Sequence, residues 1–172
     1  TNVKGSEERR LANANTQDLT SLILVLGDQL THHTNALKDA VPGRDTIIMA
    51  EVSNEARYVP HNRHKIVLIF SAMRHFCDEL RSLGFSVRYF AYSNDGPSTL
   101  LEAVETTLQD CDVSELRCCE PGEHRLRTEM QQWALPIPVR LLEDQRFLCK
   151  AETFARWAEG RSQMRMEYFY RG

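Results

Sequence analysis

The sequence predicts an α/β domain built on a parallel sheet. Five short apolar runs recur along the chain, and amphipathic helical patterns lie between them. Strands that alternate with helices are typical of a doubly wound sheet with right-handed crossovers. The length of 172 residues allows one such domain and leaves no room for two large ones. We therefore expect a Rossmann-like or flavodoxin-like five-stranded sheet with strand order 3-2-1-4-5.

The strands are predicted from short runs rich in apolar residues. Residues 22–26 read Leu-Ile-Leu-Val-Leu without interruption, as expected of a central strand that is covered on both faces. The four later strands are predicted at residues 46–52, 87–92, 116–119 and 139–142. Residues 1–20 are polar and show no apolar period, so we expect a disordered leader there and the folded domain over 21–172.

The helices are predicted from apolar residues spaced three and four apart. Ile66, Ile69, Phe70 and Met73 follow this spacing and Gly84 provides a stop, which predicts a long helix over 64–83. Residues 66–70 alone would also pass for a strand, but the length of the pattern favours a helix. Further helices are predicted at 98–108, 123–133 and 151–159.

Composition and charge indicate a soluble domain with a packed core and no membrane-spanning segment. Hydrophobic residues make up 42% of the chain, yet no apolar run approaches the roughly 18–20 residues of a membrane span. A formal net charge of −3 provides no basic surface for DNA, so we expect no direct nucleic-acid binding by this chain alone. The five cysteines form no C-x-x-C pair, which indicates a reducing compartment and a cytoplasmic location.

The common catalytic and metal-binding signatures are absent from the sequence. There is no P-loop, no G-x-G-x-x-G after the first strand and no G-x-S-x-G. His32 and His33 are adjacent, and His61 and His64 are three apart, but no organised third ligand accompanies them. Solvated loop histidines are therefore the preferred interpretation. We expect no catalytic and no metal-binding residues.

Acidic residues instead follow three of the predicted strands. Asp28 follows the first strand, Glu51 and Glu55 follow the second, and Glu120 and Glu123 follow the fourth. In open α/β sheets, ligands bind beyond the carboxyl ends of the strands, where the strand order reverses. With the predicted order, that point lies between the first and fourth strands and brings Asp28 and Glu120 to one crevice. Carboxylates suit a neutral ligand rich in hydroxyls and ring N–H groups better than a phosphorylated nucleotide.

Two alternatives account for acids at these positions. Asp and Glu favour helix N-termini, so they could simply cap the following helices, and for Glu123 the two interpretations are balanced. A phosphate-receiver domain also gathers acids here, but the phospho-acceptor Asp after the third strand and the Lys after the fifth are both missing. A receiver domain is therefore not favoured.

Five ordered segments resemble the deoxyribodipyrimidine photolyase-related proteins, which are the iron–sulfur bacterial cryptochromes and (6-4) photolyases. The segments are 24–30 (LVLGDQL), 50–58 (AEVSNEARY), 70–76 (FSAMRHF), 120–123 (EPGE) and 166–171 (MEYFYR). The resemblance covers residues 22–171 and only the amino-terminal domain of that family. Members continue with a helical domain that holds FAD, a four-iron–four-sulfur cluster and the DNA-lesion site.

The resemblance implies an antenna chromophore, 6,7-dimethyl-8-ribityllumazine, in this domain. Asp28 and Glu55 would accept hydrogen bonds from it, and Ile69 would form an apolar wall, although Ile69 also lies on the core stripe of its helix. The binding residues that the resemblance implies are Gly27, Asp28, Gln29, Glu55, Tyr58 and Ile69, with Glu51, Glu120 and Glu123 as weaker candidates.

The resemblance also implies a role within a larger flavoprotein. The parent family are lyases of DNA photorepair or blue-light sensors, and this chain alone would be non-catalytic because the FAD and iron–sulfur half is absent. That half is the expected partner, in cis or in trans. Large side chains between Phe154 and Tyr170 should then be exposed and could favour self-association. The alternative is a stand-alone flavodoxin-like binding or interaction domain without a chromophore.

Overall fold

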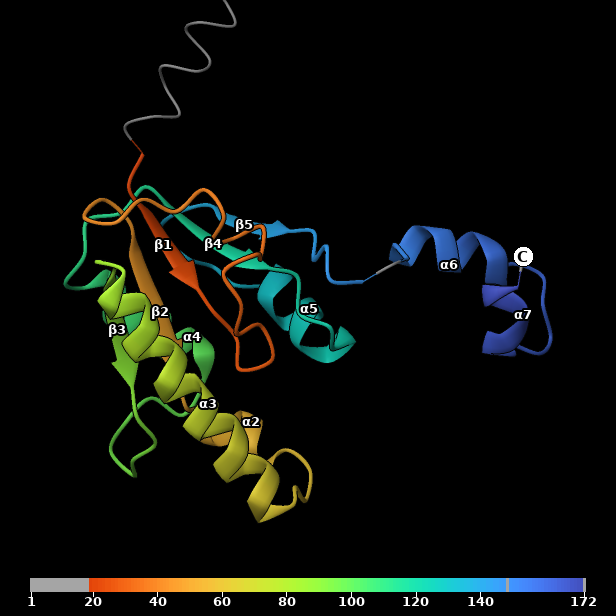
Figure 1. The fold of residues 1–172 in the computed structure, drawn as a ribbon, viewed down its shortest axis with the longest axis horizontal. Coiled ribbons are helices and arrows are strands. Elements are labelled where there is room, and N and C mark those ends of the chain that lie inside the picture. Colours follow the sequence, from red (N-terminus) through yellow and green to blue (C-terminus); the bar gives the residue numbers. More distant parts are fainter. Residues whose placement is uncertain (1–18, 148, 172) are drawn as a thin grey trace, which may run out of the picture.

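The sheet confirms the predicted fold class and strand order. In the computed structural model, which describes residues 19–147 and 149–171, five parallel strands are arranged in the order β3-β2-β1-β4-β5 (Figure 1). The strands are β1 (Ser21–Leu24), β2 (Thr46–Ala50), β3 (Ser86–Phe90), β4 (Glu115–Cys119) and β5 (Val139–Leu142). The predicted leader falls largely on residues 1–18, which lie outside the described residues.

The central strand β1 is buried and pairs with a strand on each side. All four residues of β1 are buried, as the uninterrupted apolar run predicts. Leu24 pairs with Ile48 of β2 on one side and with Cys118 of β4 on the other. The chain therefore leaves three neighbouring strands at the same edge of the sheet, which is where the polar residues after β1, β2 and β4 gather.

Four of the helices lie where the sequence predicts them, within three residues at either end. They are α3 (Arg63–Ser82), α4 (Leu100–Leu108), α5 (His124–Gln131) and α6 (Ala151–Ala158). The Asn62 side chain caps the start of α3 by accepting a hydrogen bond from the His64 amide at 2.8 Å. Gly84, with a φ of 87°, follows the end of that helix.

Two short helices were not predicted. They are α2 (Ser53–Arg57) and α7 (Met166–Tyr170), each five residues long. A segment of this length holds little more than one helical turn, so it shows no apolar period in the sequence. No helix in the described part of the chain has both the length and the apolar character needed to cross a membrane.

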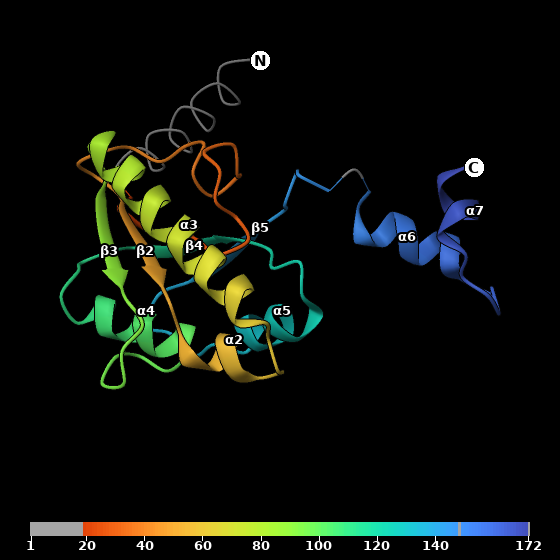
Figure 2. The same ribbon diagram turned by 60° about the horizontal axis from the view of Figure 1, so that its bottom comes forward.

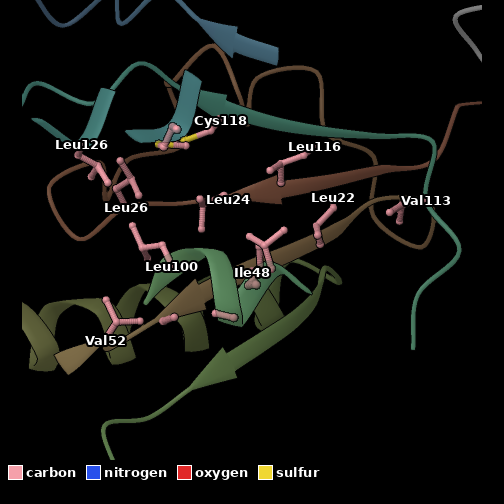
Figure 3. Close-up of a cluster of buried hydrophobic side chains, with 14 residues drawn as sticks. Leu22, Leu24, Leu26, Ile48, Val52, Leu100, Val113, Leu116, Cys118 and Leu126 are labelled. Carbon is pink, nitrogen blue, oxygen red and sulfur yellow. The ribbon is translucent and has the colours of Figure 1, made fainter. Parts of the chain in front are cut away.

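The two faces of the sheet have separate hydrophobic clusters. One cluster joins Leu22 and Leu24 of β1 to residues of α4 and α5, and Figure 3 shows its side chains converging on the sheet. The other joins Ile23 to α3 and to the connection between β1 and β2. Figure 2 shows α3 lying across that second face. The fold is thus a sheet covered on both sides.

The last two helices lie apart from the sheet (Figures 1 and 2). Phe154 and Trp157 of α6 pack against Phe169 of α7, with ring centroids 5.3 and 5.1 Å from it. Tyr168 and Tyr170 remain 53% and 70% exposed. Self-association through this segment stays a prediction.

A buried carboxylate ties three elements together next to β2. Arg74 of α3 donates hydrogen bonds to Glu51 at 2.6 and 2.7 Å, and the Tyr89 hydroxyl and the Tyr92 amide donate two more. Burial acts to raise the pKa of Glu51, but these hydrogen bonds outweigh it and hold the pKa below its ordinary value. Glu51 therefore works as an anion that joins β2, α3 and β3.

We expect Glu51→Gln to lower the free energy of unfolding by about 1–3 kcal/mol at neutral pH, because Arg74 loses its counter-ion. The pKa of Glu51 is lower in the folded chain than its ordinary value of 4.5. Its contribution is therefore complete above about pH 4.5 and is lost as the pH falls through the folded-state pKa. Urea unfolding at several pH values checks this, because the difference in the free energy of unfolding between wild type and variant should decrease as the pH falls. A difference that stays the same at acid pH would contradict this role of the Glu51 anion.

Candidate ligand-binding site at the strand switch point

A cavity of about 270 Å³ lies beyond the carboxyl ends of β1, β2 and β4. Leu26, Gly27 and Asp28 reach it from the end of β1, and Pro121 to Glu123 reach it from the end of β4. Strand order reverses between these two strands. The cavity therefore occupies the place where doubly wound sheets bind their ligands.

The walls of the cavity are mainly apolar and come from both faces of the sheet. On one side, α3 contributes Ile66, Ile69, Phe70 and Met73. The opposite side is formed by residues that also belong to the first core cluster, and Figure 3 labels them: Leu26, Val52, Leu100 and Leu126. The cavity is thus an extension of the packed core, which fixes the position of its walls.

Gly27 allows α3 to lie close to the end of β1. A Cβ atom at this position would stand 3.1 Å from Cγ2 of Ile69 and 3.1 Å from the sulfur of Met73. Any larger residue would push these side chains into the cavity or away from the sheet. The glycine therefore lets Ile69 and Met73 pack against the end of β1 without displacement.

Charged and polar side chains stand around the apolar walls. They are Asp28, Glu55, Tyr58, His61, Lys65 and Glu123. The Asp28 side chain is exposed to solvent, and its carboxylate accepts no hydrogen bond from any described residue. Behind it, Arg146 donates to the Asp28 backbone carbonyl and pairs with Asp144 at 2.6 Å. Hydrogen bonds from Arg146 lower the pKa of Asp144, although burial opposes them.

The other two carboxylates of the cavity share one arginine. Arg125 of α5 pairs with Glu55 at 2.6 Å and with Glu123 at 2.9 Å. Its guanidinium also lies over the Tyr58 ring, 4.3 Å from the ring centroid. Hydrogen bonds from the guanidinium to the two carboxylates raise the pKa of Arg125 above its ordinary value, so the arginine stays charged.

Six of the nine predicted site residues line the cavity: Gly27, Asp28, Glu55, Tyr58, Ile69 and Glu123. The structure places the other three outside it. The carboxylate of Glu51 accepts hydrogen bonds from Arg74 and from the Tyr89 hydroxyl. Gln29 is buried and donates to the carbonyls of Cys119 and Glu120 at 3.2 Å. The carboxylate of Glu120 pairs with Arg127 at 3.1 Å.

Several cavity residues were missed in the sequence, although part of the signal was present. Ile66, Phe70 and Met73 share the helical face of Ile69, so the spacing that predicts α3 also predicts these neighbours. No such signal points to Lys65 or to the pairing of Arg125. Among the described residues, no group of three or more His, Cys, Asp or Glu could hold a metal ion.

We expect Gly27→Ala to destabilise the domain by about 1–3 kcal/mol, because its methyl group overlaps the side chain of Ile69. The second change Ile69→Ala should recover part of this loss, since it removes the atom that is overlapped. Urea unfolding of the two single variants and the double variant measures the coupling. Strictly additive losses would show that the two positions are not in the close contact described.

Two comparisons with known proteins identify the family of the chain. The profile of the family described as "Deoxyribodipyrimidine photo-lyase-related protein" matches residues 23–172. A (6-4) photolyase of Agrobacterium fabrum is 42% identical over 156 residues, which make up 89% of this chain and 31% of the relative. The matched region includes β1 from Ile23 onward, the other four strands and all the residues that line the cavity. The chain belongs to the deoxyribodipyrimidine photolyase-related family.

Proposed function

We propose that this chain is the antenna-binding domain of a photolyase- or cryptochrome-related flavoprotein, and that its cavity binds 6,7-dimethyl-8-ribityllumazine. The proposal rests on the mainly apolar cavity at the strand switch point and on the exposed carboxylate of Asp28 beside it, which accepts no hydrogen bond from a described residue. When bound, this chromophore absorbs light and passes the excitation to a flavin. The domain has only to bind the chromophore, orient it and exclude water.

The size and the apolar character of the cavity suit such a ligand. Small-molecule pockets of proteins typically measure about 300–1,000 Å³, and the cavity of about 270 Å³ lies just below the lower end of this range, which suits one small molecule. Ile69, Phe70 and Met73 provide apolar surface for a heterocyclic ring. The close approach of Ile69 to Gly27 fixes that surface relative to the sheet.

The charges around the cavity suit a ligand without phosphate. Asp28 can accept hydrogen bonds from ribityl hydroxyls or a ring N–H, because no described residue occupies its carboxylate. Three carboxylates line the cavity, those of Asp28, Glu55 and Glu123. Arg125 already pairs with Glu55 and Glu123, and Lys65 also lines the cavity. A phosphate would therefore meet repulsion mainly from Asp28, whereas an uncharged chain of hydroxyls would meet none.

The role of the whole protein is a further part of the proposal. The chain spans 31% of the length of the (6-4) photolyase that it resembles. We propose that it works with a helical domain that carries FAD and a four-iron–four-sulfur cluster, in cis or in trans, in DNA photorepair or light sensing in the cytoplasm. On this proposal the chain alone neither binds DNA directly nor catalyses repair. Its net charge of −3 supports the first of these expectations.

One observation favours a second candidate, a domain of this family that binds no chromophore. The carboxylates of Glu55 and Glu123 already form ion pairs with Arg125, so most of the polar side of the cavity has its charges balanced without a ligand. Such a domain would serve as an interaction or scaffold unit. Titration with the lumazine distinguishes the two candidates.

We expect the purified chain to bind one equivalent of the lumazine. A ligand of roughly two dozen non-hydrogen atoms at about −0.3 kcal/mol per atom gives about −7 kcal/mol, which is a Kd on the order of 10 µM or tighter. Fluorescence titration and equilibrium dialysis measure it, with riboflavin phosphate as the phosphorylated control. Absence of saturable lumazine binding would favour the domain without chromophore.

We expect Ile69→Trp to abolish lumazine binding while the domain stays folded. The larger ring would occupy the cavity, at a cost of about 1–3 kcal/mol that a single domain can survive. Leu68→Trp is the matched control, because Leu68 is the neighbouring residue of α3 and is 69% exposed. Circular dichroism checks the fold of both variants. Equal lumazine affinity in the two folded variants would remove Ile69 from the site.

A further inference from the structure

One wall of the cavity belongs to an element with little packing of its own. Glu55 lies on α2 and Tyr58 follows it directly, and both line the cavity. No residue of α2 is buried, and the helix has only five residues. A helix this short gains almost nothing from its own hydrogen bonds, so contacts with the rest of the domain must hold it in place. The Asn54 amide donates to the Ser98 carbonyl at 3.0 Å, and the Arg57 guanidinium lies over the Tyr92 ring.

Arg125 adds contacts from the opposite wall to the residues that line the cavity. Its Nη2 donates to Oε2 of Glu55 at 2.6 Å, across 70 residues of sequence. Its Nε donates to Oε1 of Glu123 at 2.9 Å, and its guanidinium covers the Tyr58 ring. Its Nη1 also pairs with Glu129 of the same helix at 3.5 Å. Glu55, Tyr58 and Glu123 line the cavity, whereas Arg125 and Glu129 do not.

We propose that Arg125 is a positioning residue for the ligand: by holding Glu55, Tyr58 and Glu123 together, it keeps the α2 wall and the α5 wall at the spacing that binds the chromophore. The inference rests on the proposed lumazine-binding function. It assigns recognition of the ligand's hydrogen-bond donors to Asp28, which no described residue occupies. It assigns to Glu55 and Glu123 the task of binding Arg125.

The arginine suits this task better than a lysine would. A planar guanidinium can pair with two carboxylates and at the same time stack on an aromatic ring, whereas an ammonium offers one compact charge. Without a cation, the carboxylates of Glu55 and Glu123 would stand together unbalanced, and their repulsion would drive the two walls apart. Loss of Arg125 should therefore weaken ligand binding more than it destabilises the domain.

The same helix provides a matched control. Arg127 lies two residues after Arg125, is exposed to a similar degree, and also forms an ion pair, with Glu120 at 3.1 Å. Neither Arg127 nor Glu120 lines the cavity. Arg127→Met removes the same chemical group from the same helix without touching the proposed site.

The experiment compares lumazine affinity, measured by fluorescence titration, among the whole chain and its variants. We expect Arg125→Met to weaken the affinity at least about tenfold, Arg125→Lys to weaken it less, and Arg127→Met to change it by less than about twofold. Thermal unfolding of each variant shows whether it is folded at the temperature of the titration. If Arg125→Met does not fold, Arg125→Lys replaces it in the comparison.

A double-mutant cycle tests whether Arg125 acts through its two carboxylate partners. In the Glu55→Gln, Glu123→Gln background, adding Arg125→Met should weaken the lumazine affinity by less than about threefold, because the groups that it positions are no longer charged. A residue that affected binding only through general stability would cause the same loss in both backgrounds. Equal losses would therefore overturn the inference.

The titration separates the positioning role of Arg125 from the proposed function. If the wild-type chain binds no lumazine, the proposed function fails and the inference fails with it. If the wild-type chain binds lumazine and the folded Arg125→Met variant binds it equally well, only the positioning role of Arg125 is overturned.

Discussion

The reversal of strand order between β1 and β4 determines where the sheet leaves room for a ligand. The connections that leave β1 and β4 turn to opposite faces of the sheet. Within residues 19–147 and 149–171, no single helix covers the carboxyl ends of both strands, and a gap is left between the two connections. The gap is bounded by α3 on one face and by the starts of α4 and α5 on the other. Gly27 then sets its width, because the missing side chain lets Ile69 and Met73 rest almost on the backbone.

Carboxylates near this gap serve different physical purposes. Glu51 is fully buried and saturated with donors, so it stabilises the contact between β2 and α3. Glu55 and Glu123 share Arg125 and join two walls of the cavity. Of these four acids, Asp28 is the one whose carboxylate accepts no hydrogen bond from the described residues, although Arg146, which donates to its backbone carbonyl, is close enough to feel its charge. A count of acids after strands does not distinguish these purposes, and the arrangement of the arginines does.

The sheet and the long helices could be predicted because each has a local signal. The run 22–26 indicates a buried central strand, and the spacing of Ile66, Ile69 and Met73 indicates α3. The position of the site also followed from the acids after strands. Which acids face the cavity could not be predicted, because it depends on partners far along the chain: Arg74 is 23 residues from Glu51, and Arg125 is 70 from Glu55. The short helix α2 has too few residues to show a period.

The most direct measurement is a crystal structure of the chain grown with saturating lumazine. We expect a single chromophore in the cavity at the carboxyl ends of β1 and β4, with its ring in contact with Ile69 and with Asp28 accepting a hydrogen bond from it. We also expect Arg125 to keep its contacts to Glu55 and Glu123 in the complex. A chromophore bound elsewhere on the surface, or a cavity that stays empty at saturating lumazine, would show that this cavity is not the binding site.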